Sequence, residues 1–210
     1  MAHIVLLGDS IFDNKAYVGG EPDVVAHLQS MIPPDWTATL MAVDGSLAEN
    51  VGSQLASSPK TATHLVISTG GNNALMNTDV LNLEVRTSAE VFRVLSNRLE
   101  EFERQYQKML ETVLRRNLPT AVCTIYNPNF VEPLLQKIAT VALSAFNDVI
   151  IRQAISARIP FLDLRLVCSE RSDYANEIEP SSAGGRKIAA KILETIENHD
   201  FSFKRTSVYF

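Results

Sequence analysis

The chain has 210 residues, of which 46% are hydrophobic, and its formal net charge is −5. This length fits a single globular domain with a sizeable core, and the composition excludes a disordered chain. The acidic balance argues against a protein dedicated to nucleic acid, because such proteins usually present a basic face.

Cysteine usage and apolar run lengths indicate the compartment. Cys123 and Cys168 lie in apolar stretches and form no C-x-x-C pair, so buried, reduced thiols are expected. The apolar run at residues 4–7 is too short for a signal peptide. No stretch reaches the ~18 consecutive apolar residues of a membrane span. We therefore expect a cytoplasmic protein without a membrane span.

Strand-like and helix-like segments alternate along the chain, which predicts one α/β domain over residues 1–200. The first strand is expected at residues 4–7, where a continuous apolar run ends at glycine. In chain order there follow a helix at 23–31, a strand at 36–43, a weak helix at 47–55 and a strand at 64–68. The later elements are a long helix with apolar residues recurring from 91 to 113, a strand at 121–125, a second long helix at 134–157, a strand at 160–164 and a closing helix at 182–198.

Five strands joined by helical crossovers predict a three-layer α/β/α sandwich around a five-stranded parallel sheet. Residues 201–210 form an aromatic tail with three phenylalanines and a tyrosine. Such a tail either docks on the domain or contacts a partner, which leaves a homodimer open.

Four polar segments fall where ligands bind in open parallel sheets, beyond the carboxyl ends of the strands. They are Gly8-Asp9-Ser10, Asp44-Gly45-Ser46, Thr69-Gly70-Gly71-Asn72-Asn73, and residues 176–181 before the closing helix. A serine in a tight glycine turn presents its hydroxyl rigidly, and an asparagine amide or a backbone N–H can donate to an oxyanion. Each segment alone is a common turn or helix cap, whereas their order along the sheet indicates a site.

With these segments the sequence resembles the SGNH (GDSL-type) esterases and lipases, from residue 4 to about residue 196. The family's first block matches residues 7–10, its G-x-N-D block matches residues 70–73, and its D-x-x-H-P block aligns with residues 176–180. The resemblance implies a flavodoxin-like SGNH fold with Ser10 as the nucleophile. It also implies that Gly45 and Asn72 are oxyanion-hole donors, that the substrate is a small-molecule ester, and that no metal or organic cofactor is needed.

The sequence departs from the family's pattern at the residues that would form the general base of the catalytic site. Glu179 stands in the position of the family's histidine, Asn176 in that of its aspartate, and Asn73 in that of the aspartate of G-x-N-D. The histidines of the chain are expected at strand starts or on helices away from these turns: His3, His27, His64 and His199.

We hypothesise that Glu179 is the general base for Ser10. Burial would have to raise its pKa from ~4.3 towards ~6–7 for this role. The hypothesis also has Asn176 orient the Glu179 carboxylate by a hydrogen bond. The alternative for Glu179 is structural, because a carboxylate at a helix start interacts favourably with the helix dipole.

Two functions of different classes remain open. The first is a serine hydrolase that acts on carboxylic esters through an acyl-enzyme at Ser10. The second is a catalytically impaired module on the same fold that binds an acyl or carbohydrate ligand. Phosphate binding at the glycine turns is disfavoured, because no phosphate-binding glycine motif occurs there. In either case we expect segments 11–20, 73–86 and 126–133 to shape the pocket, and Asp163 to pair with Arg165.

Overall fold

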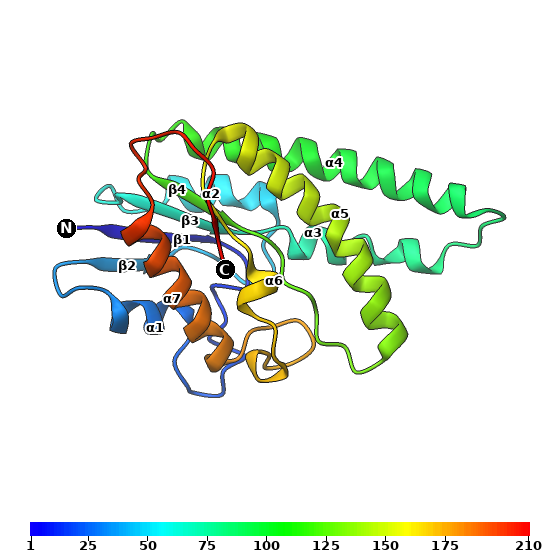
Figure 1. The fold of residues 1–210 in the computed structure, drawn as a ribbon, viewed down its shortest axis with the longest axis horizontal. Coiled ribbons are helices and arrows are strands. Elements are labelled where there is room, and N and C mark those ends of the chain that lie inside the picture. Colours follow the sequence, from blue (N-terminus) through cyan, green and yellow to red (C-terminus); the bar gives the residue numbers. More distant parts are fainter.

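A computed structural model describes residues 1–210, and a parallel six-stranded sheet forms its centre (Figure 1). The strands are β1 (His3–Gly8), β2 (Thr37–Leu40), β3 (His64–Ser68), β4 (Thr120–Cys123), β5 (Phe161–Leu162) and β6 (Val208–Tyr209). They lie in the order β2-β1-β3-β4-β5-β6, and every neighbouring pair is parallel. The three-layer α/β/α sandwich predicted from the sequence is confirmed.

Helices cover both faces of the sheet because successive strand residues point to opposite sides. Val5, Leu7 and Ile67 face the layer of α2 (Val51–Ala56), α4 (Ser88–Leu114) and α5 (Pro133–Ala157). Ile4, Leu6 and Val66 face the layer of α1 (Val24–Met31) and α7 (Ser182–Asn198). Strands buried on both faces are expected to read as continuous apolar runs, as β1 and β3 do.

The predicted strand at 36–43 is shorter in the structure. The N–H groups of Met41 and Ala42 both donate to the Leu6 carbonyl, at 2.8 and 2.9 Å, so the ladder loses its register after Leu40. The predicted helix at 47–55 begins as a 3₁₀ turn, η1 (Ala48–Asn50), and continues as α2. Four short elements have no clear signal in the sequence: α3 (Gly71–Leu75), η2 (Thr78–Asn82), α6 (Leu164–Val167) and η3 (Arg171–Asp173).

The prediction of five strands is wrong by one, because the C-terminal tail adds β6 at the edge of the sheet. The Phe161 N–H donates to the Ser207 carbonyl at 3.0 Å, and the Asp163 N–H donates to the Tyr209 carbonyl at 2.8 Å. The Lys191 ammonium donates to the Phe210 carbonyl at 2.7 Å. Of the two roles left open for the tail, the structure shows docking on its own domain.

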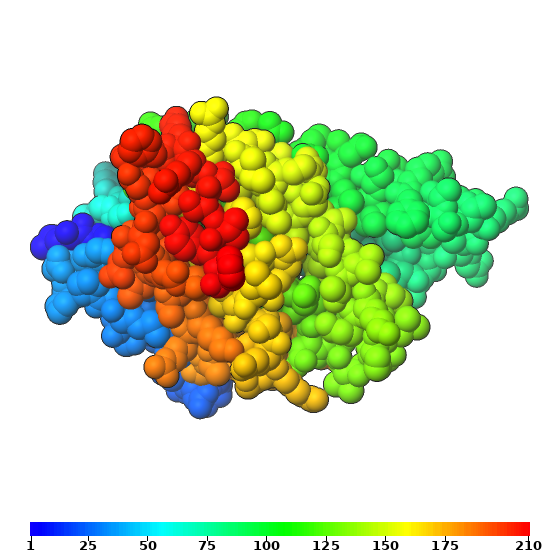
Figure 2. All heavy atoms as spheres, in the orientation of Figure 1, coloured from blue at the N-terminus to red at the C-terminus, as the bar shows by residue number.

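Helices α4 and α5 extend past the sheet on the right of Figure 1. In the space-filling view the start of α4 and the residues before it form a projecting arm, and the start of α5 forms a separate lobe below it (Figure 2). By length and composition α5 alone among the helices reaches what a bilayer span requires, with 25 residues and a mean hydropathy of 1.4 in its most apolar window. The core helices of soluble proteins have the same two properties, so length and hydropathy do not establish a membrane span. Such core helices are mostly buried, whereas only 22% of this window of α5 is buried.

Candidate active site

Ser10 and Glu179 meet at the carboxyl edge of the sheet although 169 positions separate them in the sequence. Ser10 lies in the turn after β1, and Glu179 lies in the loop between η3 and α7. The Ser10 hydroxyl donates to Oε1 of Glu179 at 3.0 Å, and both residues are only 6% exposed. The other carboxylate oxygen, Oε2, is buried without a hydrogen-bond partner. The Ser10 hydroxyl is therefore the one protein group that donates to this side chain.

Burial changes the acidity of Glu179. It raises the pKa of this carboxyl from 4.5 to about 7, a rise that the Ser10 hydrogen bond opposes and the negative charge of Asp44 adds to. A general base is most effective when its pKa lies near the working pH. Glu179 thus combines hydrogen-bond contact with the hydroxyl and a pKa suited to accepting its proton near neutral pH.

Asn176 makes no hydrogen bond to the Glu179 carboxylate, so the hypothesis that it orients this group by such a bond is wrong. Its Oδ1 accepts from the backbone N–H groups of Ile178 and Glu179, each at 2.9 Å. A short amide side chain commonly bonds to backbone groups two or three residues further on, which forms a local turn. Asn176 therefore shapes the main chain that carries Glu179.

Two buried side chains that sequence reasoning missed secure the loop of Glu179. Asn14 accepts from the Val24 N–H at 3.0 Å and donates to the Pro180 carbonyl at 3.1 Å, which ties this loop to the start of α1. Asp173 accepts from the Ser169 N–H at 3.1 Å and pairs with the Lys187 ammonium at 2.8 Å. No pattern distinguishes Asn14 from an exposed loop residue, because its partners lie elsewhere in the chain. Asp173 also has a local partner, the Glu170 N–H at 3.0 Å, with which it forms a capping box at η3.

The expected oxyanion donors lie in the turns that follow β2 and β3. Asn72, on α3, donates one amide hydrogen to the Ser46 carbonyl at 3.0 Å and lines the same cavity as Ser10. Gly45 has a left-handed φ of +78° and does not line this cavity, although its neighbour Ser46 contacts Asn72. The backbone N–H groups of Ser10 and Gly45 have no acceptor within the chain. The structure thus brings Asn72, Ser10 and Glu179 to one cavity, whereas Gly45 is not part of its lining.

The remaining residues singled out in the sequence have structural partners. Asn73 is buried, and its Oδ1 accepts from the Ala48 N–H at 3.1 Å. Asp163 pairs with Arg165, as expected, and accepts from the Thr124 hydroxyl at 3.0 Å. None of the four histidines lines the cavity.

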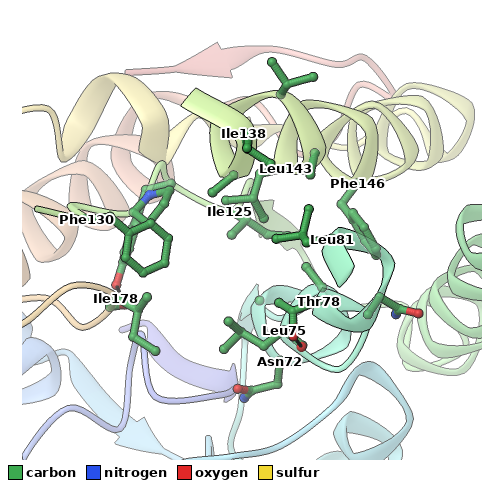
Figure 3. Close-up of a pocket in the computed structure, with 18 of the residues that line it drawn as sticks. Asn72, Leu75, Thr78, Leu81, Ile125, Phe130, Ile138, Leu143, Phe146 and Ile178 are labelled. Carbon is green, nitrogen blue, oxygen red and sulfur yellow. Dashed lines mark hydrogen bonds between the residues drawn. The ribbon is translucent and has the colours of Figure 1, made fainter. Parts of the chain in front are cut away.

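A cavity of about 480 Å³ adjoins Ser10, Asn72 and Glu179, and 19 of its 30 lining residues are hydrophobic. Figure 3 shows Ile125, Ile138, Leu143 and Leu81 in the upper part of the view, Leu75 with Asn72 at the bottom, and Phe130 with Ile178 at the left. Lining residues come from the expected segments 73–86 and 126–133, but of segment 11–20 only Ile11 contributes. The apolar walls from α4 and α5 were not predicted, because the inner faces of these helices read as ordinary core positions.

The sequence from residue 6 to residue 187 matches the GDSL-like Lipase/Acylhydrolase family. The chain belongs to this family. The resemblance stated from the turns and their order is therefore confirmed, and the protein is a GDSL-family member that carries Glu179 beside its serine.

Solved structures similar to this GDSL-family protein have the same fold over nearly their whole length. A lipase from a goat rumen metagenome superposes with a TM-score of 0.71 at 19% identity, covering 92% of this chain and 97% of its own. An extracellular lipase from Streptomyces rimosus superposes with a TM-score of 0.69 at 14% identity, covering 93% of this chain and 99% of its own. Phospholipase A1 from Streptomyces albidoflavus superposes with a TM-score of 0.69 at 13% identity, covering 92% of this chain and 98% of its own. A search of curated protein sequences finds no match.

Proposed function

We propose that this protein is a serine hydrolase of carboxylic esters in which Ser10 forms the acyl-enzyme and Glu179 is the general base. The observation that carries this proposal is the 3.0 Å hydrogen bond from the Ser10 hydroxyl to the buried Glu179 carboxylate. Membership of a family of lipases and acylhydrolases supports the reaction class.

In the first half-reaction, Glu179 accepts the Ser10 proton while Oγ attacks the ester carbonyl. We assign three hydrogen-bond donors to the oxyanion that forms: the Asn72 amide and the free backbone N–H groups of Ser10 and Gly45. Collapse of the tetrahedral intermediate breaks the bond to the alcohol, which takes the proton from Glu179. In the second half-reaction, Glu179 removes a proton from water, the hydroxide attacks the acyl-enzyme, and Ser10 leaves with that proton.

The cavity favours an ester with an extended apolar acyl chain. Its volume falls within the ~300–1,000 Å³ of typical ligand sites, and its walls offer hydrophobic side chains where a sugar would need hydrogen bonds. The names of structural neighbours include a phospholipase A1 and an acetyl xylan esterase, so these names do not choose between acyl sizes. The apolar lining supports the longer chain.

Covalent labelling tests the proposal directly. An alkyl fluorophosphonate reacts only with an activated serine, and we expect it to modify the folded protein once, at Ser10. Mass spectrometry of the intact protein and of its peptides measures this, with Ser10→Ala as the unlabelled control. Absence of labelling in folded protein, together with no turnover of p-nitrophenyl esters, would favour the acyl-binding module instead.

Asn72→Ala is expected to lower kcat by ~10²–10³, because the amide donates to charge that develops only in the transition state. KM for a p-nitrophenyl ester should change little. Asn82→Ala is the matched control, since Asn82 is exposed and does not line the cavity. Thermal melting of both variants separates a catalytic effect from the loss of the bond to Ser46, and an unchanged kcat would remove Asn72 from the mechanism.

A further inference from the structure

Large apolar side chains project into solvent around the cavity. We define the apolar collar as five of them, which are 46 to 76% exposed: Leu81, Phe92, Val131, Leu134 and Val141. Leu81, Phe92 and Val141 also line the cavity, so the collar is continuous with its wall. Single apolar residues on a surface are ordinary, whereas a contiguous group marks an interaction site.

The collar comes from two parts of the chain that meet at one end of the molecule. One part runs from η2 to the start of α4, and the other comprises the loop before α5 and the first half of that helix. Both parts lie where α4 and α5 project past the sheet (Figure 1). The low burial of α5, 22% of its most apolar window, therefore has a local cause in this exposed half of the helix.

The charge around the collar indicates which kind of surface fits it. The segments 72–93 and 128–142 contain four acidic and three basic residues: Asp79, Glu84, Glu90, Glu132, Arg86, Arg93 and Lys137. Attraction to anionic lipid requires clustered Lys and Arg, which are missing here. An apolar surface without a basic cluster fits a neutral or zwitterionic lipid layer.

We propose that the apolar collar docks this protein on a neutral or zwitterionic lipid surface, with α5 lying along the interface and the cavity opening into the acyl-chain layer. A lipid layer is the occupant that matches both the collar and the cavity, because an acyl chain that leaves the layer would pass directly into a cavity with apolar walls. A second protein copy seated tightly on the same five side chains would cover the cavity instead. The suggested substrate delivery rests on the proposed function, whereas the docking itself does not.

Flotation of the full-length protein with phosphatidylcholine vesicles tests the docking. We expect the wild type to float with the vesicles, and the double variant V131Q/L134Q to partition at least about tenfold more weakly, because two apolar contacts with lipid are lost. Neither residue lines the cavity, so turnover of a water-soluble short-chain ester should stay within about twofold of wild type. The matched control is L166Q/F203Q, whose residues are 57 to 68% exposed but lie outside the collar and the cavity wall; it should float like wild type.

The other arms of the experiment separate the possible occupants. Replacing part of the phosphatidylcholine with phosphatidylserine should not strengthen binding; if anionic lipid is required, the proposal of a neutral surface is wrong. Failure of the wild type to float, or equal flotation of the collar variant, overturns the docking. A stable dimer in light scattering that V131Q/L134Q converts to monomer would identify a second copy as the occupant. Ser10→Ala protein should float like wild type, so the flotation result tests the docking independently of the proposed hydrolase activity.

Discussion

Replacing Glu179 by glutamine is expected to lower kcat/KM for ester hydrolysis by ~10²–10⁴, the contribution of a positioned general base. Glutamine keeps the size of the side chain and an oxygen that accepts from the Ser10 hydroxyl, but it cannot take the proton. Glu177→Gln is the matched control, because Glu177 is exposed and lies two positions away. Steady-state kinetics on a p-nitrophenyl ester measures the effect, and turnover equal to wild type would return Glu179 to a structural role.

The pH dependence of the wild type should report the same group. Glu179 acts as a base only when ionised, and its pKa is raised to about 7 by burial. Activity should therefore rise with pH through about 7 and level off above it. An acid limb near 4, the range of an ordinary carboxylate, would show that the group controlling the reaction is not this buried one.

The raised pKa also predicts how stability depends on pH. Between about 4.5 and about 7 the folded protein holds a proton on Glu179 that the unfolded chain has lost, so the free energy of unfolding falls as pH rises. Asp9 acts in the same direction, because burial, with the negative charge of Glu179 adding to it, raises its pKa from 3.8 to about 7. Glu179 alone accounts for a fall of up to about 3 kcal/mol.

Glu179→Gln should therefore be less active than wild type and, at about pH 8, more stable, with a shallower pH dependence. Urea unfolding of both proteins across pH measures this. A carboxylate kept for packing alone has no reason to show the two opposite changes together. Equal stability of the two proteins above pH 7 would mean that the carboxyl is ionised in the fold without cost.

Sequence pattern was informative wherever burial follows a local period. The apolar run of β1, the spacing along α4 and the alternation of elements were enough to predict the parallel sandwich, and the closing helix begins and ends where predicted. The order of the polar turns predicted that Ser10, Asn72 and Glu179 would lie at one edge, which is where the structure places them. These features depend on near neighbours in the chain or on the topology of parallel strands.

Features that depend on distant partners were missed. Asn14 is buried because Pro180 and Val24 satisfy its amide, and nothing near Asn14 in the sequence specifies this. Strand β6 has two residues, and only the edge of β5 makes them a strand. Asn176 was expected to serve the carboxylate three residues later, but the closer backbone N–H groups are its partners.

Gly8→Ala is expected to destabilise the fold by at least about 4 kcal/mol or to prevent folding. Losses of this size arise from severe overpacking and backbone strain, and this substitution would cause both. Gly8 has a φ of +128°, and a Cβ at this position would lie 1.7 Å from the Ser68 carbonyl oxygen of β3. Neither backbone can retreat easily, because the Gln54 amide is bonded to both the N–H and the carbonyl of Gly8, each at 2.8 Å. Urea or thermal unfolding measures the loss.

Gly52→Ala is the control for this substitution. Gly52 lies in α2, and a Cβ there would meet only the Thr112 methyl at 3.9 Å, so alanine should be neutral or stabilising by up to about 1 kcal/mol. The contrast between the two glycines tests how the nucleophile is placed. β1 ends in direct contact with β3 at Gly8, and the chain then turns so that Ser10, two residues later, faces Glu179. If Gly8→Ala folds with wild-type stability, this close approach of the strands is not what holds the serine turn.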